Sequence, residues 1–187
     1  VDDIAPGDGA AADLGHDASE YDLPPLNVIQ HTVKTDPKQG QIFAVEAQTL
    51  SERRDARRDS IAERASLCAQ TVLAQPDEPW IIWCELNAEA DALMALLPGA
   101  VEIRGTHEES QKEQSLKDFS DGKIKWLVSK PKICGWGLNW QHCANMAFIG
   151  VSDSFEQYYQ AVRRCWRFGQ KRLVNVHVIA SDQEGAV

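Results

Sequence analysis

Two arginines near the carboxyl end of the chain have the type and spacing of phosphate-binding groups. Arg164 and Arg167 stand three residues apart, and Gln157 and Gln160 precede them at helical spacing. At about 100° per residue, a helix places these four polar side chains on one face. A planar guanidinium group matches phosphate oxygens better than an ammonium group does. On helical geometry alone, a solvated polar face is the simpler interpretation.

The opposite side of the same predicted helix is apolar. Four large side chains recur at helical spacing: Phe155, Tyr159, Val162 and Trp166. This pattern predicts a stripe that packs on a sheet. We expect the helix to span residues 155–168, with Ser154 and Gln157 as a capping box and Gly169 as the stop.

Glycines and a hydroxyl follow predicted strands. Gly135 and Gly137 bracket Trp136, and a backbone without side chains can approach a phosphate or a facing domain closely. An ordinary turn explains these glycines equally well. Thr106 follows Gly105 and could present its hydroxyl and amide to a phosphate, whereas a turn or capping role is the simpler interpretation.

Metal and disulfide chemistry are not indicated by the cysteines. The five cysteines are widely spaced and form no C-x-x-C pair: Cys68, Cys84, Cys134, Cys143 and Cys165. We therefore expect no metal site and interpret them as reduced core residues. His142 lies beside Cys143 without a third partner in the sequence, so we expect packing or capping there rather than catalysis.

The sequence lacks the groups that cradle a nucleoside triphosphate. It contains no G-x-x-x-x-G-K-[ST] loop and no Asp-Glu-x-His or similar magnesium-binding strand. It also contains no G-x-G-x-x-G after the first predicted strand, which argues against a small-molecule enzyme with a Rossmann-like sheet. Any ATP chemistry needs a second domain.

The elements that position these residues alternate between strand and helix. We expect strands at 28–33, 80–84, 101–103, 124–128, 146–151 and 174–179, and helices near 51–75, 88–97, 110–119 and 155–168. Such alternation predicts an α/β fold of three layers, with a mainly parallel sheet and helices on both faces. Ligands bind beyond the carboxyl ends of the strands in such folds.

Charge is unevenly distributed along the chain. The formal net charge is -9, but residues 1–25 hold seven acids and no Lys or Arg. We expect residues 1–22 to be an acidic linker or a disordered segment, and residues 23–187 to form one domain. Residues 155–172 carry five bases and one acid, so a local anion site is compatible with the acidic total.

A second basic cluster lies at the start of the long helix predicted near 51–75. Its bases alternate with acids along the sequence: Arg53, Arg54, Asp55, Arg57, Arg58 and Asp59. A solvated face with intrahelical ion pairs is the simpler interpretation. A surface that follows phosphates is the alternative.

Four short segments occur in the order found in one family of nucleic-acid motors. They are Ile103-Arg104-Gly105-Thr106, Leu127-Val128-Ser129, Gly135-Trp136-Gly137-Leu138-Asn139-Trp140 and Gln160-x-x-x-Arg164-x-x-Arg167-x-Gly169-Gln170. With the apolar strand Ile81-Ile82-Trp83-Cys84, they resemble the C-terminal RecA-like lobe of the Swi/Snf-type ATPases of helicase superfamily two. The likeness to helicase-like proteins of bacteriophages is close.

The resemblance implies a role for each matching residue. Arg164 and Arg167 would be arginine fingers that reach across a cleft to the phosphates of ATP. The nucleotide side of the site would also include Gln160, Gly135, Gly137, Asn139 and Asp153. The nucleic acid would meet Arg104, Gly105, Thr106, Ser129 and Lys130.

The resemblance also sets expectations for partners. ATP and Mg²⁺ would be held mainly by an N-terminal RecA-like lobe outside this chain, so we expect the chain alone to be inactive. Trp136 and Trp140, on a predicted loop, are the candidates for an interface with that lobe, whereas we expect Trp126 and Trp166 to be core. The nucleic acid would be double-stranded DNA. With no apolar stretch of membrane-spanning length, we expect a cytoplasmic protein of a bacterial host cell or prophage. The alternative is a RecA-like module that binds nucleic acid or protein without catalysis.

Overall fold

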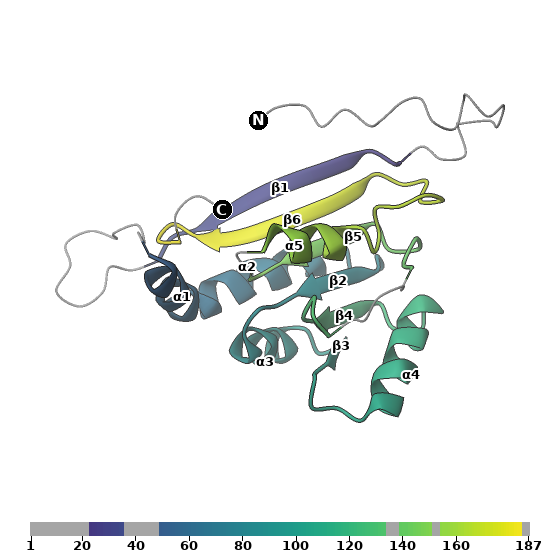
Figure 1. Cartoon of the computed structure of the whole chain (residues 1–187), viewed down its shortest axis with the longest axis horizontal. Coiled ribbons are helices and arrows are strands. Elements are labelled where there is room, and N and C mark those ends of the chain that lie inside the picture. The colour runs from purple at the N-terminus through teal and green to yellow at the C-terminus, as the bar shows by residue number, and fades with distance from the viewer. Residues whose placement is uncertain (1–22, 36–48, 134–138, 151–153, 185–187) are drawn as a thin grey trace.

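A six-stranded parallel sheet forms the centre of the protein in the computed structural model, which describes residues 23–35, 49–133, 139–150 and 154–184 (Figure 1). The strands are β1 (Leu26–Val33), β2 (Trp80–Trp83), β3 (Ala100–Ile103), β4 (Trp126–Ser129), β5 (Asn145–Phe148) and β6 (Val174–Ser181). Their order is β1-β6-β5-β2-β4-β3, and every neighbouring pair is parallel. The parallel sheet predicted from the alternation is confirmed.

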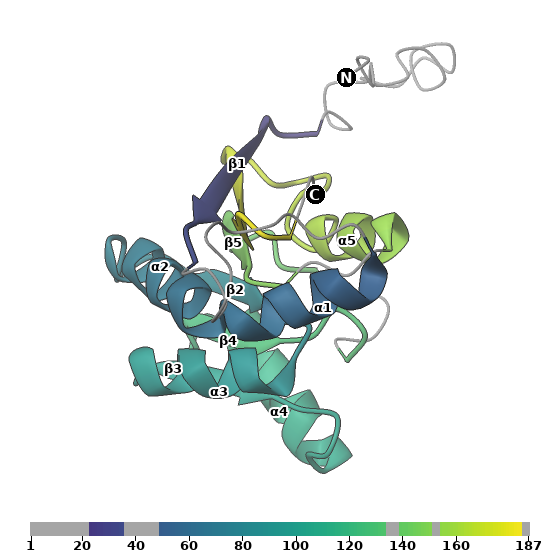
Figure 2. The ribbon, with the colours of Figure 1, turned by 90° about the vertical axis from the view of Figure 1, so that its left-hand side faces the viewer.

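Helices cover both faces of the sheet, as predicted. Helices α2 (Ile61–Leu73) and α3 (Asn87–Leu96) contribute buried side chains to the core on one face. Helices α4 (Glu109–Ser120) and α5 (Phe155–Val162) contribute to the core on the other. Helix α1 (Leu50–Asp59) crosses in front of the carboxyl ends of the strands, which face the viewer in Figure 2.

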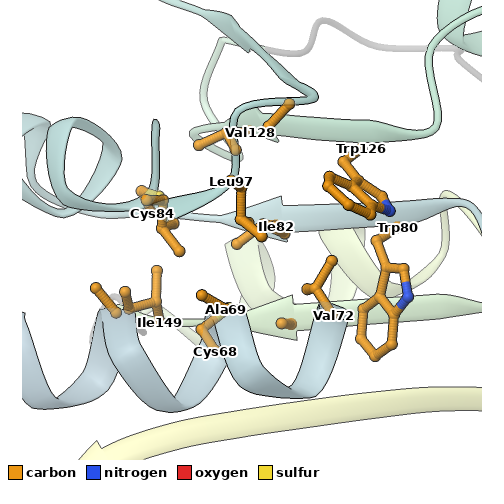
Figure 3. Close-up of a cluster of buried hydrophobic side chains, with 14 of the residues drawn as sticks. Cys68, Ala69, Val72, Trp80, Ile82, Cys84, Leu97, Trp126, Val128 and Ile149 are labelled. Carbon is orange, nitrogen blue, oxygen red and sulfur yellow. The ribbon is translucent and has the colours of Figure 1, made fainter. Parts of the chain in front are cut away.

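Strand β2 supplies both cores, because its side chains alternate between the faces. Trp80 and Ile82 pack with α2 and α3, whereas Ile81 and Trp83 pack on the opposite face. Figure 3 shows Trp80 and Ile82 among the side chains of the first core. A central strand that is buried on both faces explains its uninterrupted apolar sequence.

Four cysteines are buried and free, in agreement with the prediction: Cys68, Cys84, Cys143 and Cys165. Burial raises the pKa of the Cys68 thiol to about 12, so this side chain behaves as a small apolar group. The fifth, Cys134, lies outside the described residues.

The single long helix predicted near 51–75 is wrong, because the chain bends at Ser60. The backbone there has φ -105° and ψ 12°, and it separates α1 from α2. The Ser60 hydroxyl donates to the carbonyl of Ala56 (2.8 Å) and accepts from Nε of Arg64 (3.0 Å). A serine that bonds back to the preceding turn competes with regular helix geometry, and the bend directs α1 across the strand ends.

Candidate functional site

Two neighbouring strands bring the predicted nucleic-acid residues to one edge of the sheet. Ile103 and Ser129 are register partners at the ends of β3 and β4. Arg104, Gly105 and Thr106 follow β3 directly, and Lys130 follows β4. Gly105 and Thr106 are exposed. Ser129 is buried and its Oγ donates to the carbonyl of Ile103 (3.1 Å), so its hydroxyl ties the two strands together.

Arg104 is held by two carboxylates. Its guanidinium forms ion pairs with Glu102 and Asp91, and the hydrogen bonds that it donates to Glu102 and then to Asp91 raise its pKa. The side chain is 30% exposed. A phosphate that binds Arg104 would therefore join or replace these partners, whereas Lys130 forms no ion pair within the described part of the chain.

Helix α5 is shorter than predicted, and the side that it turns towards the sheet differs from the predicted one. It ends at Val162, and Phe155 and Tyr159 are 73% and 41% exposed. The prediction that these two residues pack on the sheet is wrong. The buried side is formed by Ala161 and Val162, with Tyr158 against Phe148 (ring centroids 4.9 Å apart), because the short helix presents its small residues to the sheet.

Arg164 and Arg167 lie on turns beyond α5 rather than on a regular helix. The carbonyl of Arg164 accepts from the amide of Trp140 (2.9 Å), and the carbonyl of Arg167 accepts from the amide of Gln170 (3.2 Å). Nε of Arg167 is buried without a hydrogen-bond partner among the described residues. These bonds fix the backbone of the arginine segment against the segment that begins at Asn139.

Gln170 is a positioning residue that the sequence reasoning did not assign. Its Nε2 donates to the carbonyls of Gln141 (2.8 Å) and Cys143 (3.1 Å). Its Oε1 accepts from the amide of Arg172 (2.9 Å), and the residue is buried. It thus anchors the end of the arginine segment to the start of β5. The sequence signal that could have pointed to this role is its place at the end of the motif that contains Arg164, Arg167 and Gly169.

Trp140 was predicted to face a missing domain, and this is wrong. The residue is fully buried. Its indole packs against Phe119 (ring centroids 5.2 Å apart) and Trp83 (6.3 Å), and Nε1 donates to Ser120 Oγ (3.0 Å). Trp140 therefore joins α4 to the core beside the arginine segment.

The remaining aromatic predictions are confirmed in full or in part. Trp126, predicted to be core, is buried. Trp166, also predicted to be core, packs against the core but is only half-buried, and its Nε1 donates to the carbonyl of Pro24 (2.7 Å). His142 packs against Phe119 (ring centroids 5.0 Å apart), and burial lowers its pKa. The imidazole is therefore a packed side chain, as expected.

Not every predicted nucleotide-side residue can be placed. Asn139 and Gln160 are exposed, and the Trp140 amide bond links the Asn139 segment to Arg164. Gly135, Gly137 and Asp153 lie outside the described residues, as does Trp136. Within the described part of the chain, no group of three or more His, Cys, Asp or Glu side chains could hold a metal ion. No helix there is long and apolar enough to cross a membrane.

Comparison with solved structures identifies the fold as RecA-like. The RNA helicase Prp28 of Chaetomium thermophilum bound to ADP superposes with a TM-score of 0.60 at 10% identity, over 86% of this chain and 34% of that chain. The C-terminal part of the Fun30 ATPase domain gives a TM-score of 0.56 at 18% identity, over 66% of this chain and 42% of that chain. These likenesses show the fold alone.

The family follows from the sequence comparison. The family described as the helicase conserved C-terminal domain matches residues 63–169, more than half of the chain. The chain therefore belongs to this family of helicase domains. It is also 29% identical over 105 residues to the TATA-binding protein-associated factor mot1 of Schizosaccharomyces pombe, a stretch that covers 52% of this chain and 5% of mot1. The chain thus spans a small part of this relative.

Proposed function

We propose that this chain is the C-terminal motor lobe of an ATP-dependent DNA translocase or helicase. ATP and its Mg²⁺ ion bind mainly to a preceding RecA-like lobe. Arg164 and Arg167 complete the site when the two lobes close, and they offset the charge that develops on the transferred phosphoryl group. Closure moves this lobe along double-stranded DNA. The motif likeness extends the proposal to a cytoplasmic protein of bacteriophage or prophage origin.

The observation that carries this proposal is the environment of the two arginines. A catalytic arginine must be held in place before its phosphate arrives. The carbonyls of Arg164 and Arg167 are bonded to Trp140 and Gln170, and Nε of Arg167 is buried but unpaired among the described residues. A buried, unpaired donor costs free energy, which a phosphate oxygen would recover. Gln160 and Asn139 are proposed to line the same nucleotide side, with Gly135, Gly137 and Asp153.

A second group of residues supports contact with nucleic acid. Arg104, Gly105, Thr106, Ser129 and Lys130 lie together at the carboxyl ends of β3 and β4, where open parallel sheets bind ligands. Exposed backbone and hydroxyl groups at Gly105 and Thr106 suit the phosphate contacts that position a duplex. We propose that this edge is the part of the DNA track carried by this lobe.

The test is ATP hydrolysis by a protein that joins this chain to its preceding lobe, with and without double-stranded DNA. We expect Arg167→Ala to lower turnover on the order of a thousandfold. Arg163→Ala is the matched control, because Arg163 lies over the Trp166 ring (5.4 Å to the centroid) and not in the proposed finger position. The control should retain turnover within about threefold, an allowance well below the effect of an arginine finger.

Three results would contradict the proposal in different ways. Unchanged turnover in Arg167→Ala would remove the finger assignment. Hydrolysis by the 187-residue chain alone would mean that other residues of the chain hold ATP. A two-lobe protein that binds DNA without hydrolysis would favour the alternative of a non-catalytic binding module.

A further inference from the structure

A cleft at the carboxyl edge of the sheet gathers cations from distant parts of the sequence. It has a volume of ≈ 490 Å³ and lies between α1, the segments after β2 and β4, and the first turn of α5. Figure 2 shows α1 crossing in front of these strand ends. Four cations and one carboxylate line the cleft: Arg54, Arg57, Arg58, Lys132 and Glu85. The lining is therefore strongly cationic.

A buried ion cluster holds the floor of this cleft. Nε of Arg57 donates to Glu184 Oε2 (3.0 Å), and Nη1 of Arg64 donates to Glu89 Oε1 (2.7 Å). The side chains of Arg64 and Glu89 are 0% exposed. Glu89 Oε2 also accepts from the amides of Glu85 (2.8 Å) and Leu86 (2.9 Å). The Arg57 bond fixes α1 against the residues that follow β6, and the Glu89 bonds fix α2 and the segment after β2 against α3.

The outer cations of the cleft are available to a ligand. Arg54 and Lys132 are exposed and line the cleft, and neither forms an ion pair with another described residue. Arg58 has only an exposed pair with Asp55 (3.4 Å), and such pairs contribute little. Arginines and lysines with unused charge are suited to phosphate.

We propose that this cleft binds phosphate groups of a nucleic-acid backbone, and that it extends the DNA track of the proposed function across the sheet. Among the described residues of the lining, Leu86 is the single apolar side chain and none carries an aromatic ring, so this described lining suits phosphates and offers no ring on which a base could stack. Recognition is therefore independent of sequence. This inference rests on the proposed function for the identity of the ligand.

Continuity along the sheet edge distinguishes a backbone from a free phosphate. The proposed contacts at the ends of β3 and β4 lie next to the cleft, which is lined by residues that follow β2 and β4. Two strand spacings from β3 to β2 amount to roughly 10 Å. One DNA strand places about three phosphates along that length. Arg54 thus adds a contact from α1, a helix that precedes the residues matched by the helicase family.

The test is the salt dependence of duplex DNA binding by the 187-residue chain. The double variant Arg54→Ala with Lys132→Ala should lower the slope of log affinity against log salt by about 2, since each lost phosphate contact accounts for about 0.9. The loss should be equal on A·T-rich and G·C-rich duplexes. The matched control is Lys125→Ala with Arg172→Ala, which removes two exposed charges paired with Asp77 and Glu78.

Each outcome has a distinct meaning. Equal slopes for the double variant and the unaltered chain, with melting temperatures unchanged, would overturn the inference and leave the proposed function standing. An equal loss in both double variants would also overturn it, because net charge alone would explain the effect. Absence of DNA binding by the unaltered chain at low salt would overturn the inference, whereas the proposed function would still be decided by ATP hydrolysis of the two-lobe protein. Binding of tripolyphosphate in the cleft with unchanged DNA affinity would assign the cleft to a free phosphate.

Discussion

Single side chains hold the arginine segment in place. The three hydrogen bonds of Gln170 join the turn after Arg167 to the residues that lead into β5. Gly169 makes this possible, because its φ of +84° is a conformation that favours glycine. A Cβ at Gly169 would lie 2.9 Å from Gln141 Nε2. Gly169 therefore allows the backbone to turn, whereas the side chain of Gln170 holds the turn in place.

Replacing Gln170 with alanine should destabilise the domain. The change leaves the buried carbonyl of Cys143, the part-buried carbonyl of Gln141 and the amide of Arg172 without this partner, and we expect the free energy of unfolding to fall by about 2–3 kcal/mol. Urea denaturation measures this. Gln111→Ala is the control, because Gln111 is exposed on α4, and a loss in Gln170→Ala no larger than in this control would contradict the anchoring role.

The types of the site residues could be predicted from the sequence, but their surroundings could not. The spacing of Arg164 and Arg167 belongs to a recognisable motif. Sequence cannot reveal that Arg104 pairs with Asp91, because the two meet through tertiary packing. It also cannot reveal that Trp140 is buried under α4, since an isolated tryptophan on a predicted loop is equally suited to an interface.

At the scale of elements, the contact between β1 and β6 contains a pair of histidines. Nε2 of His31 lies 2.9 Å from Nδ1 of His177, and the two ring planes are nearly parallel (10°), with centroids 5.1 Å apart. The Trp80 ring lies 5.3 Å from His177. Burial, and then the charge of His31, lower the pKa of His177 to about 4. The two imidazoles can therefore share a hydrogen bond at neutral pH, and His177 resists protonation.

Stability should fall as the pH is lowered from 7 towards 4. In this window the unfolded chain takes up a proton at His177, with an ordinary pKa near 6.5, while the folded chain does not, so acid favours unfolding. We expect a loss of about 1–2 kcal/mol after allowance for solvent screening. Urea midpoints at pH 7 and pH 5 for the unaltered chain and for His177→Gln measure it. An equal pH dependence in the two proteins would exclude the pair as its cause.

Gly150, which follows β5, packs so closely against Glu89 of α3 that there is no space for a side chain. A Cβ at Gly150 would lie 2.5 Å from Glu89 Oε2 and 3.0 Å from the Cβ of Glu85. Because Glu89 is fixed in the buried ion cluster, we expect Gly150→Ala to lower the free energy of unfolding by about 1–3 kcal/mol. Gly105→Ala is the control, since its nearest neighbour would be 4.0 Å away. Thermal melts that coincide for the two variants would contradict this account.

Element types were predictable where the periodicity is strong, and element ends were less so. The break at Ser60 depends on a local bond between its hydroxyl and Ala56, and many serines inside helices do not interrupt them. The early end of α5 depends on the pairing of Arg164 with Trp140. Both boundaries are set by contacts that a repeating pattern of apolar residues does not contain.

At the scale of the whole molecule, the sheet joins the two ends of the described chain. The alternation of strand and helix predicted a parallel sheet, but the order β1-β6-β5-β2-β4-β3 is decided by which strands bury the most apolar surface. β2 lies at the centre because Trp80, Ile81, Ile82 and Trp83 are fully buried. β1 lies at the edge and leaves Val28 47% exposed.

The position of β1 has a consequence for synthesis of the chain on the ribosome. β1 is made first, but in the described sheet its only neighbour is β6, which is made last; their register partners Leu26 and Val174 are separated by nearly the whole domain. The nascent chain must therefore carry an unpaired first strand until translation has passed Ser181. A chain that stops before β6 would lack β6, and β1 would have no strand in the described sheet with which to pair.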